Sequence, residues 1–284
     1  MSLGLSTVAR AAYRTDSVRL DRVIQATLRR NIDRRANGFG LPWETFAPQQ
    51  VPSSTSQSSA LRDAFSFYIE QMYFTEAASP ENLAALAASS PVAQVQQAFA
   101  AQIQDEIAHG QMLQRYVVDK LGYSDPREHW VSYVGRKSGK VMQAMHPAVG
   151  ARAVTMAIEY YASSLAEALL EKVDEPLLRA ILQDIQKDEN RHRVLAVESA
   201  ALLQTAGVGQ SFVGRATAAL LLPAAEAWFR HVMNGALRSH CAVMGIPFGD
   251  LYEKAVEHMR LDLQQALSST SITPPAETPT ALPS

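Results

Sequence analysis

The chain has 284 residues, of which 47% are hydrophobic and 19% are charged, and its net charge is −2. A chain of this size and composition can bury a sizeable core, in one large or two small domains. The balanced charge gives no indication of nucleic-acid binding. The single cysteine, Cys241, excludes an internal disulfide framework and fits a reducing compartment.

No part of the sequence indicates a membrane protein. A bilayer-spanning helix needs about 18 or more consecutive apolar residues, whereas the most apolar stretch, 216–223, is much shorter. The first residues also lack the pattern of a signal peptide. We therefore expect a cytoplasmic protein with neither a membrane nor a nucleic acid among its partners.

The pattern along the chain predicts an all-α protein. Gly and Pro are sparse in the middle of the chain, Ala, Leu, Gln and Glu are abundant there, and strand-like alternation is nearly absent. An Arg-rich helix is expected at 16–36, capped by Asp16 or Ser17. The Pro-, Ser- and Gln-containing segment 38–59 is expected to be an irregular covering loop.

Four longer helices are expected to follow the covering loop. The first spans 60–88, and the second spans 91–121 with Ser90 as its cap and Pro91 in its first turn. A linker over 122–147, with a short helix near Trp130, leads to the third helix at 150–173. The fourth begins after Glu175-Pro176 and ends near 205–207. Short connections within each pair and a long crossover between the pairs predict a ferritin-like four-helix bundle.

Two further helices, 214–244 and 249–267, are expected to pack outside the four. The last stretch, 268–284, is rich in Pro, Thr, Ser and Ala and is expected to be disordered. The predicted organisation is therefore an N-terminal region (1–59), a helical bundle with its two outer helices (60–267) and a tail (268–284).

One short motif occurs twice, each time within a predicted helix. The copies are Asp105-Glu106-Ile107-Ala108-His109 and Asp188-Glu189-Asn190-Arg191-His192. In a helix, residues i and i+3 lie on the same face, so each Glu and His can point at one site. A Glu three residues before a His also arises by chance, but both copies have Asp before the Glu and both follow an apolar helix that carries another Glu.

The other two ligands come from the first and third of the four helices. Glu159 is preferred to Glu167 because the residues that share its helix face are small or apolar. Glu76 is preferred on the first helix because it lies on an apolar stripe, and Glu70 is the alternate if Pro80 ends that helix early. The predicted metal ligands are Glu76 (alternate Glu70), Glu106, His109, Glu159, Glu189 and His192.

This ligand set indicates two iron ions, with manganese as the alternative. Mixed His and carboxylate ligation suits these metals better than zinc, and four buried acids without metal would repel one another. Two ferrous ions can reduce dioxygen together if an external donor supplies electrons. Asp105 and Asp188 can each accept the outer N–H of the opposite His; the alternative is that they are solvent-facing partners of Arg191 or Lys187.

The substrate is less well indicated. An apolar cavity beside the metals is expected, although residues at helical spacing can also be ordinary packing. Its predicted lining residues are Phe67, Met72, Phe99, Met156 and Tyr160.

A basic face on the helix 16–36 suggests a protein partner. Such a face can dock an acidic acyl or peptidyl carrier protein, or it can be an ordinary solvated surface. At least three of the following arginines can share the face: Arg19, Arg22, Arg29 and Arg30.

From 65 to 198 the chain resembles the soluble acyl carrier protein desaturases and their ferritin-like, ribonucleotide-reductase-like relatives. Three segments carry the resemblance: Thr75-Glu76-Ala77-Ala78-Ser79-Pro80, Glu106-Ile107-Ala108-His109-Gly110, and Asp188-Glu189-Asn190-Arg191-His192. The chain departs from the desaturases at Ala162, where the family has Thr. It departs from the similar arylamine N-oxygenases at Ile185, where they have an additional His.

The resemblance implies a non-heme di-iron oxidase or oxygenase that desaturates, hydroxylates or otherwise oxidises an acyl, carrier-tethered substrate. It also implies an electron-transfer partner such as a ferredoxin, and a homodimer. A small-molecule N-oxygenase or an aldehyde-type oxygenase is an alternative. From another class, the alternative is a ferritin- or rubrerythrin-like protein that handles iron or peroxide.

Overall fold

The computed structural model describes residues 15–37, 41, 43, 59–129, 133, 159–208, 234–269 and 271–272. These residues are almost entirely helical, which confirms the predicted all-α class. The helices are α1 (Val18–Asn37), α2 (Ser59–Ser89), α3 (Ala93–Asp119), α6 (Tyr160–Leu170), α7 (Pro176–Thr205), α9 (Asn234–Val243) and α10 (Phe248–Ser269). Two short strands, β1 (Thr15–Asp16) and β2 (Ser271–Ile272), pair antiparallel.

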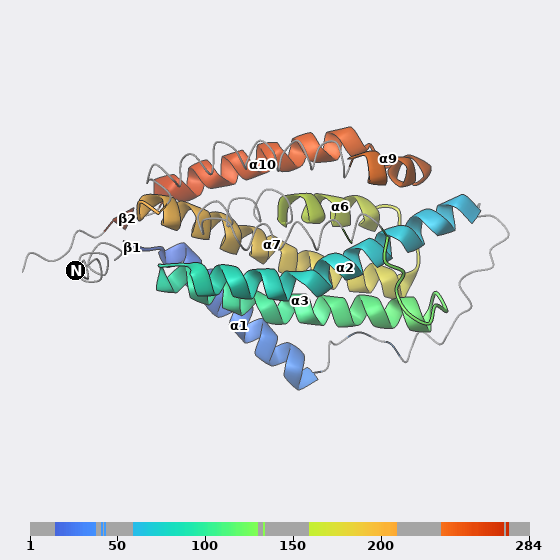
Figure 1. The fold of residues 1–284 in the computed structure, drawn as a ribbon, viewed down its shortest axis with the longest axis horizontal. Helices are drawn as coiled ribbons and strands as arrows, with labels where there is room; N and C mark the ends of the chain where they lie inside the picture. The colour runs from blue at the N-terminus through green and yellow to red at the C-terminus, as the bar shows by residue number, and fades with distance from the viewer. Residues whose placement is uncertain are drawn as a thin grey trace, which may run out of the picture.

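The helices form a bundle in which α3 runs alongside α2 and packs against both α2 and α7 (Figure 1). Helix α6 packs against α7, α1 crosses α3 and α7, and α10 packs on α6 and α7. None of the helices in the described part of the chain is both long and apolar enough to cross a membrane.

Local sequence explains where several helices begin and end. The hydroxyl of Ser17 accepts the backbone N–H of Leu20 at 3.1 Å, so Ser17 caps α1. Glu175 caps α7 by accepting the N–H groups of Leu177 and Leu178, with Pro176 in the first turn. Helix α7 ends at Thr205, and Gly207, which follows the C-cap Ala206, has a φ of 75° that suits a residue without a side chain.

The predicted start of α3 was wrong. Ser90 and Pro91 both precede the helix, and the N-cap is Val92, which makes no side-chain capping bond. The Ser90 hydroxyl instead accepts the N–H of Val92 at 3.3 Å in a local turn, so it does not reach the first turn of α3.

Helix α2 continues through Pro80 to Ser89. Hydroxyl groups before the proline donate to backbone carbonyls, with Thr75 bonded to Gln71 O and Ser79 bonded to Thr75 O, both at 3.0 Å. The early helix end that would have favoured Glu70 therefore does not occur.

The predicted tail boundary was also wrong, because α10 extends to Ser269 and β2 follows it. The pairing of Thr15 with Ile272 ties the start of α1 to the end of α10. Other expectations fall outside the described residues: the short helix near Trp130, residues 150–158 of the third helix, most of the helix 214–244, and most of the covering loop.

Two hydrophobic cores occupy the two ends of the bundle. One contains α2 residues 64–69, α3 residues 112–117 and α7 residues 177–185, with parts of α6 and α9. The other contains α2 residues 83–86, α3 residues 95–101 and α7 residues 195–203, with part of α1. Along α2, α3 and α7, the residues between these cores carry the acidic and histidine side chains described next.

Candidate metal centre

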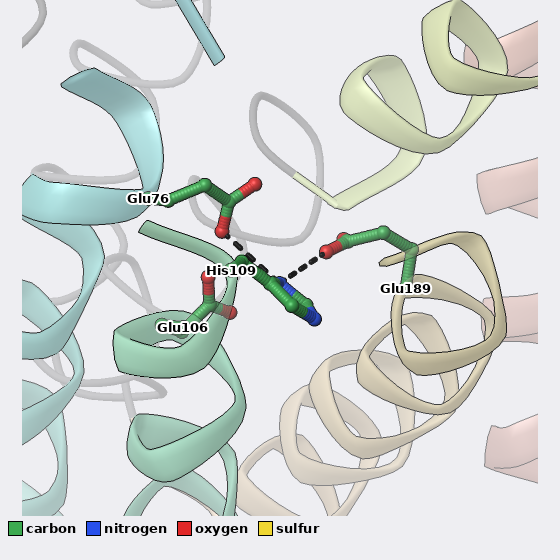
Figure 2. A group of neighbouring side chains, drawn as sticks. All are labelled: Glu76, Glu106, His109 and Glu189. Carbon is green, nitrogen blue, oxygen red and sulfur yellow. Dashed lines mark hydrogen bonds and ion pairs between the residues drawn. The ribbon is translucent and has the colours of Figure 1, made fainter. Parts of the chain in front are cut away.

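Six buried acidic and histidine side chains meet between the two cores. Helix α3 supplies Glu106 and His109, α7 supplies Glu189 and His192, α2 supplies Glu76, and Glu159 stands at the start of α6. All six residues are buried, and none is more than 5% exposed. Figure 2 shows Glu76, His109 and Glu189 converging from three helices beside Glu106.

Both imidazoles point Nδ1 at the carboxylates. His109 Nδ1 lies 3.3 Å from Glu76 Oε2 and 3.6 Å from Glu189 Oε1. His192 Nδ1 lies 3.2 Å from Glu106 Oε1 and 3.6 Å from the same Glu189 oxygen. The two ring centroids are 5.9 Å apart, and Glu189 Oε1 lies beside Nδ1 of both rings. Glu189 is therefore shared by two half-sites, each of which contains one histidine.

Ligand atoms in each half-site are close enough to hold a cation. Oxygen and nitrogen atoms of Glu76, Glu106, His109 and Glu189 all lie within 4.8 Å of one another, and so do those of Glu159, Glu189 and His192. The structure thus brings together the six preferred residues of the sequence prediction. That they bind metal stays a prediction.

Glu70, the alternate ligand on α2, lies in a different cluster. Its carboxylate accepts the backbone N–H and the guanidinium of Arg127 at 2.9–3.0 Å, and His129 Nε2 at 3.1 Å. Its partners therefore come from the segment after α3 rather than from the two histidines.

Each Asp of the repeated motif holds the histidine of the other helix. Asp188 Oδ2 lies 3.0 Å from His109 Nε2, and Asp105 Oδ2 lies 3.2 Å from His192 Nε2. Both Asp side chains are 0% exposed, so the alternative of solvent-facing partners was wrong, although Asp188 does also accept a bond from Arg191. A histidine whose Nε2 is held this way can offer the Nδ1 lone pair to a metal.

Sequence reasoning missed the arginines that surround these two aspartates. Arg34 of α1 donates to Asp105 and Asp188, and Arg30 donates to Asp188. The expectation that Arg30 belongs to an outward basic face was wrong, because its guanidinium points into this network. The missed signal is spacing, since Arg34 continues a buried stripe on α1 formed by Leu20, Ile24, Thr27 and Asn31.

A second missed residue is Gln102, which is buried one turn before Glu106. Its amide nitrogen donates to Glu106 at 2.7 Å and to Glu159 at 2.8 Å. It thereby connects α3 to the start of α6. The position four residues before Glu106 places it on the same helix face, which is the signal that the sequence offered.

Burial and mutual charge perturb the acids strongly. Burial and then the charge of Glu106 raise the pKa of Glu76 well above its usual value, and burial and then the charge of Glu189 do the same for the pKa of Glu159. Burial also opposes ionisation of Glu106, but a hydrogen bond from Glu76 and the nearby His192 outweigh it and lower its pKa. Burial and mutual repulsion therefore favour the neutral forms of Glu76 and Glu159 more than in exposed glutamates.

The pKa values of both histidines are also raised, although burial acts on them in the opposite direction. Burial lowers the pKa of each imidazole, yet the carboxylates outweigh it. The hydrogen bond and charge of Glu76 raise the pKa of His109, and the charge of Glu106 with the bond to Asp105 raises that of His192. The surrounding carboxylates thus favour the protonated form of both histidines, against the effect of burial.

Two polar atoms of the cluster show that the residues fit a metal. Within the described ranges, buried Glu159 Oε2 has no hydrogen-bond partner, and His192 Nδ1, although 3.2 Å from Glu106 Oε1, makes no hydrogen bond of suitable geometry. Unpaired buried polar atoms are costly, and coordination to a cation would satisfy both. A donor set of carboxylate oxygens and imidazole nitrogens suits iron or manganese.

The expected pocket residues that the structure describes are distributed over separate packing clusters. Phe67, Phe99 and Tyr160 belong to three separate packing clusters, and Met72 packs at the edge of the first. Phe67 stacks on the ring of His240 at 3.9 Å, and Tyr160 donates to Asp262 at 2.6 Å. Met156 lies outside the described residues. These side chains are better explained as packing.

The fold and the site together define a helical-bundle protein with a buried His and carboxylate cluster that can hold metal ions. Comparisons of the chain with protein-family models, with curated proteins and with solved structures gave no match. The function is therefore inferred from the site alone.

Proposed function

We propose that this chain is an oxygen-activating oxidase or oxygenase with a ferritin-like bundle and a centre of two iron ions, for which manganese is the alternative. The observation that carries the proposal is the pair of half-sites that share Glu189, each with one histidine Nδ1. One motif alone would suit a single cation, whereas two facing copies suit a pair.

Charge supports two divalent ions. The four glutamates match the charge of two divalent cations, and both histidines can then be neutral ligands. Around them, three arginines face three aspartates, so the outer layer is balanced as well. Its members are Arg30, Arg34, Arg191, Asp105, Asp184 and Asp188. Balanced layers reduce the cost of burying so many ionised groups.

The chain's own residues orient the ligands and exclude water. Asp105 and Asp188 hold Nε2 of the histidines, so that Nδ1 faces the centre. Gln102 keeps Glu106 and Glu159 near each other. The two hydrophobic cores close both ends of the site. Two ferrous ions, when bound, supply electrons for the reduction of dioxygen, and an external donor such as a ferredoxin would restore them.

We place the substrate among acyl compounds, including those tethered to a carrier protein. The support is the outward face of α1, where Arg22 and Arg29 are exposed. Desaturation, hydroxylation and related oxidations remain alternatives within this class, as does oxidation of a small amine or aldehyde.

The experiment that tests the proposal is anaerobic loading of the purified protein with ferrous iron, followed by an oxygen pulse. We expect two irons per chain and transient absorption changes whose decay is altered by the correct acyl-carrier substrate. The matched control is His192→Ala, which should lose most of the iron and the transient. Wild-type protein that binds no iron under these conditions would overturn the proposal.

A second candidate is a ferritin- or rubrerythrin-like protein that handles iron or peroxide. It is favoured by the dispersal of Phe67, Phe99 and Tyr160 over separate packing clusters, because these side chains then serve the core rather than a common substrate site. Iron uptake far beyond two ions per chain, or rapid peroxide consumption without an organic substrate, would select this candidate.

A further inference from the structure

A layer of charged side chains lies between the two histidines and helix α1. The central member is Arg34, whose side chain is only 7% exposed. Its Nη1 donates to Asp105 Oδ1 at 2.8 Å, and its Nη2 donates to Asp188 Oδ2 and, at 2.8 Å, to Asp184 Oδ2. One guanidinium from α1 therefore contacts the carboxylates that hold both histidines.

The neighbouring arginines are arranged differently. Arg30, also on α1, donates to Asp184 and Asp188 and makes no hydrogen bond to Asp105 within the described part of the chain. Arg191 comes from α7 itself, where it donates to Asp188 and lies 3.9 Å from Asp105. Arg34 is thus the α1 residue placed to act on both half-sites, and Arg30 is placed to act on the half-site of His109.

We propose that Arg34 is a positioning residue that couples the two histidines and makes α1 part of the metal centre. The inference rests on the proposed metal-binding function. Because a guanidinium is planar and rigid, binding two carboxylates fixes how each is turned. The fixed carboxylates in turn fix the imidazoles, with Nε2–H on Asp and Nδ1 toward the glutamates. Without α1 packed on the bundle, the carboxylates of Asp105 and Asp188 would lack the positive charge of Arg34.

The coupling can be measured in the metal-free, full-length protein by NMR of the ¹⁵N-labelled histidine side chains. Wild type should show two slowly exchanging Nε2–H signals, one from each buried histidine. Arg34→Gln should speed exchange at both. Arg30→Gln, the matched control, should speed exchange at His109 only. An Arg34→Gln effect confined to one histidine, or an equal effect of Arg30→Gln on both, would overturn the proposal.

A conservative variant guards against loss of folding. Arg34→Lys keeps the positive charge of the layer but not the planar fork, so exchange at both histidines should be faster than in wild type and slower than in Arg34→Gln. Wild-type exchange at both histidines in a folded Arg34→Lys protein would contradict the role of the fork.

Titration with Co²⁺, monitored by visible absorption, then tests whether these variants bind metal more weakly. Loss of a residue that orients a ligand typically weakens metal binding by about 10- to 100-fold. Arg34→Gln should lower the affinity for both ions by about tenfold or more, and Arg30→Gln should lower the affinity for one of them. If wild type binds no Co²⁺ while the NMR pattern holds, the metal function is wrong and the positioning of the histidines by Arg34 still stands. Equal two-ion affinity in wild type and Arg34→Gln would overturn the proposed link to the metal.

Discussion

Asp105 of α3 accepts a hydrogen bond from Nε2 of His192 on α7, at 3.2 Å, while Nδ1 of the same ring lies 3.2 Å from Glu106, the residue next to Asp105. Burial opposes ionisation of Asp105, but its bond to His192 and the nearby positive charges outweigh burial and lower its pKa. Asp105 is therefore a carboxylate that accepts, and the ring must donate from Nε2. In the repeated motif, the Asp of each copy thus accepts a hydrogen bond from the histidine of the other copy, on the other helix.

Asp105→Asn should damage metal binding at His192. Because Asp105 Oδ1 accepts from Arg34, the asparagine oxygen should stay on Arg34 and the amide NH₂ should face Nε2. That donor holds the ring proton on Nδ1, where a metal ligand needs a lone pair. We expect affinity for one of two Co²⁺ ions to fall by about 10- to 100-fold, measured by titration.

Asp184→Asn is the matched control for this prediction. Asp184 accepts from Arg30 and Arg34 but has no histidine partner in the part of the chain described here. Its variant should bind both ions nearly as well as wild type. Equal losses in Asp105→Asn and Asp184→Asn would show that charge balance, not the ring proton, controls the affinity.

Glu76→Gln should lower metal content much more than Glu70→Gln. Both glutamates are buried on α2, but only Glu76 lies beside His109, while Glu70 binds Arg127 and His129. We expect Glu76→Gln to lose about tenfold or more in affinity for at least one ion, as measured by bound iron after gel filtration. The reverse ranking would place the α2 ligand one and a half turns earlier.

Periodicity explains how much of this centre could be predicted from the sequence. The Glu-x-x-His pairs and the earlier Glu in each helix pair predict a shared site without any distance information. The inward turn of Arg30 could not be predicted this way, because its direction depends on Asp184 and Asp188 of a distant helix. From helical spacing alone, Arg30 could lie on the same outward face as Arg22 and Arg29.

Other differences have equally local causes. Apolar residues at helical spacing fit either a pocket or a core, and Phe67 and Tyr160 proved to have packing partners on α9 and α10. Ser90 and Pro91 form a standard helix start in sequence, but the bond from Val92 N to Ser90 Oγ turns the chain before α3 begins. A two-residue strand such as Ser271–Ile272 carries no pattern that composition could reveal.

Gln102→Met should destabilise the metal-free protein. The variant keeps the side-chain length but removes the amide that donates to Glu106 and Glu159. A hydrogen bond to an ionised carboxylate such as Glu106, whose pKa is lowered, contributes about 1.5–3 kcal/mol, and one to an uncharged group contributes about 1 kcal/mol. The free energy of unfolding in urea should therefore fall by about 2 kcal/mol or more. Gln97→Met, the same change at an exposed position of α3, provides the comparison. Unchanged stability of Gln102→Met would mean that the two glutamates do not depend on this donor.

Glu70 should make stability depend on pH in the acid range. Burial raises the pKa of its carboxyl, but hydrogen bonds from Arg127 and His129 outweigh burial and lower it below the usual 4.5. A lowered folded pKa means that Glu70 stabilises the fold fully above pH 4.5, and that this contribution is lost as pH falls through the lower folded value.

Glu70→Gln should therefore be less stable than wild type at neutral pH, and the difference should shrink as the pH falls below about 4.5. Urea unfolding across this range measures it, with Glu253→Gln at an exposed site on α10 as the control. A difference between wild type and Glu70→Gln that is constant with pH would contradict a stabilising role for the ionised carboxylate.

Reversing the charge of Arg22 and Arg29 should weaken binding of an acidic carrier protein without changing metal content. Among the four arginines expected to form a basic face, Arg30 is committed to Asp184 and Asp188, and Arg19 forms an ion pair with Glu198 at 3.3 Å. Arg22 and Arg29 stay exposed on α1. Such rim charges mainly raise the association rate, and salt screens them.

The double variant Arg22→Glu and Arg29→Glu should bind an acyl carrier protein severalfold more weakly in low salt, with the difference disappearing in high salt. Arg238→Glu with Arg260→Glu, two exposed positions on α9 and α10, makes the same change in net charge and should bind like wild type. Surface plasmon resonance gives the rates, and iron analysis checks the centre. If neither wild type nor the α1 variant binds a carrier, and both turn over a free small molecule equally, the substrate is not carrier-bound and the small-molecule oxygenase becomes the preferred function.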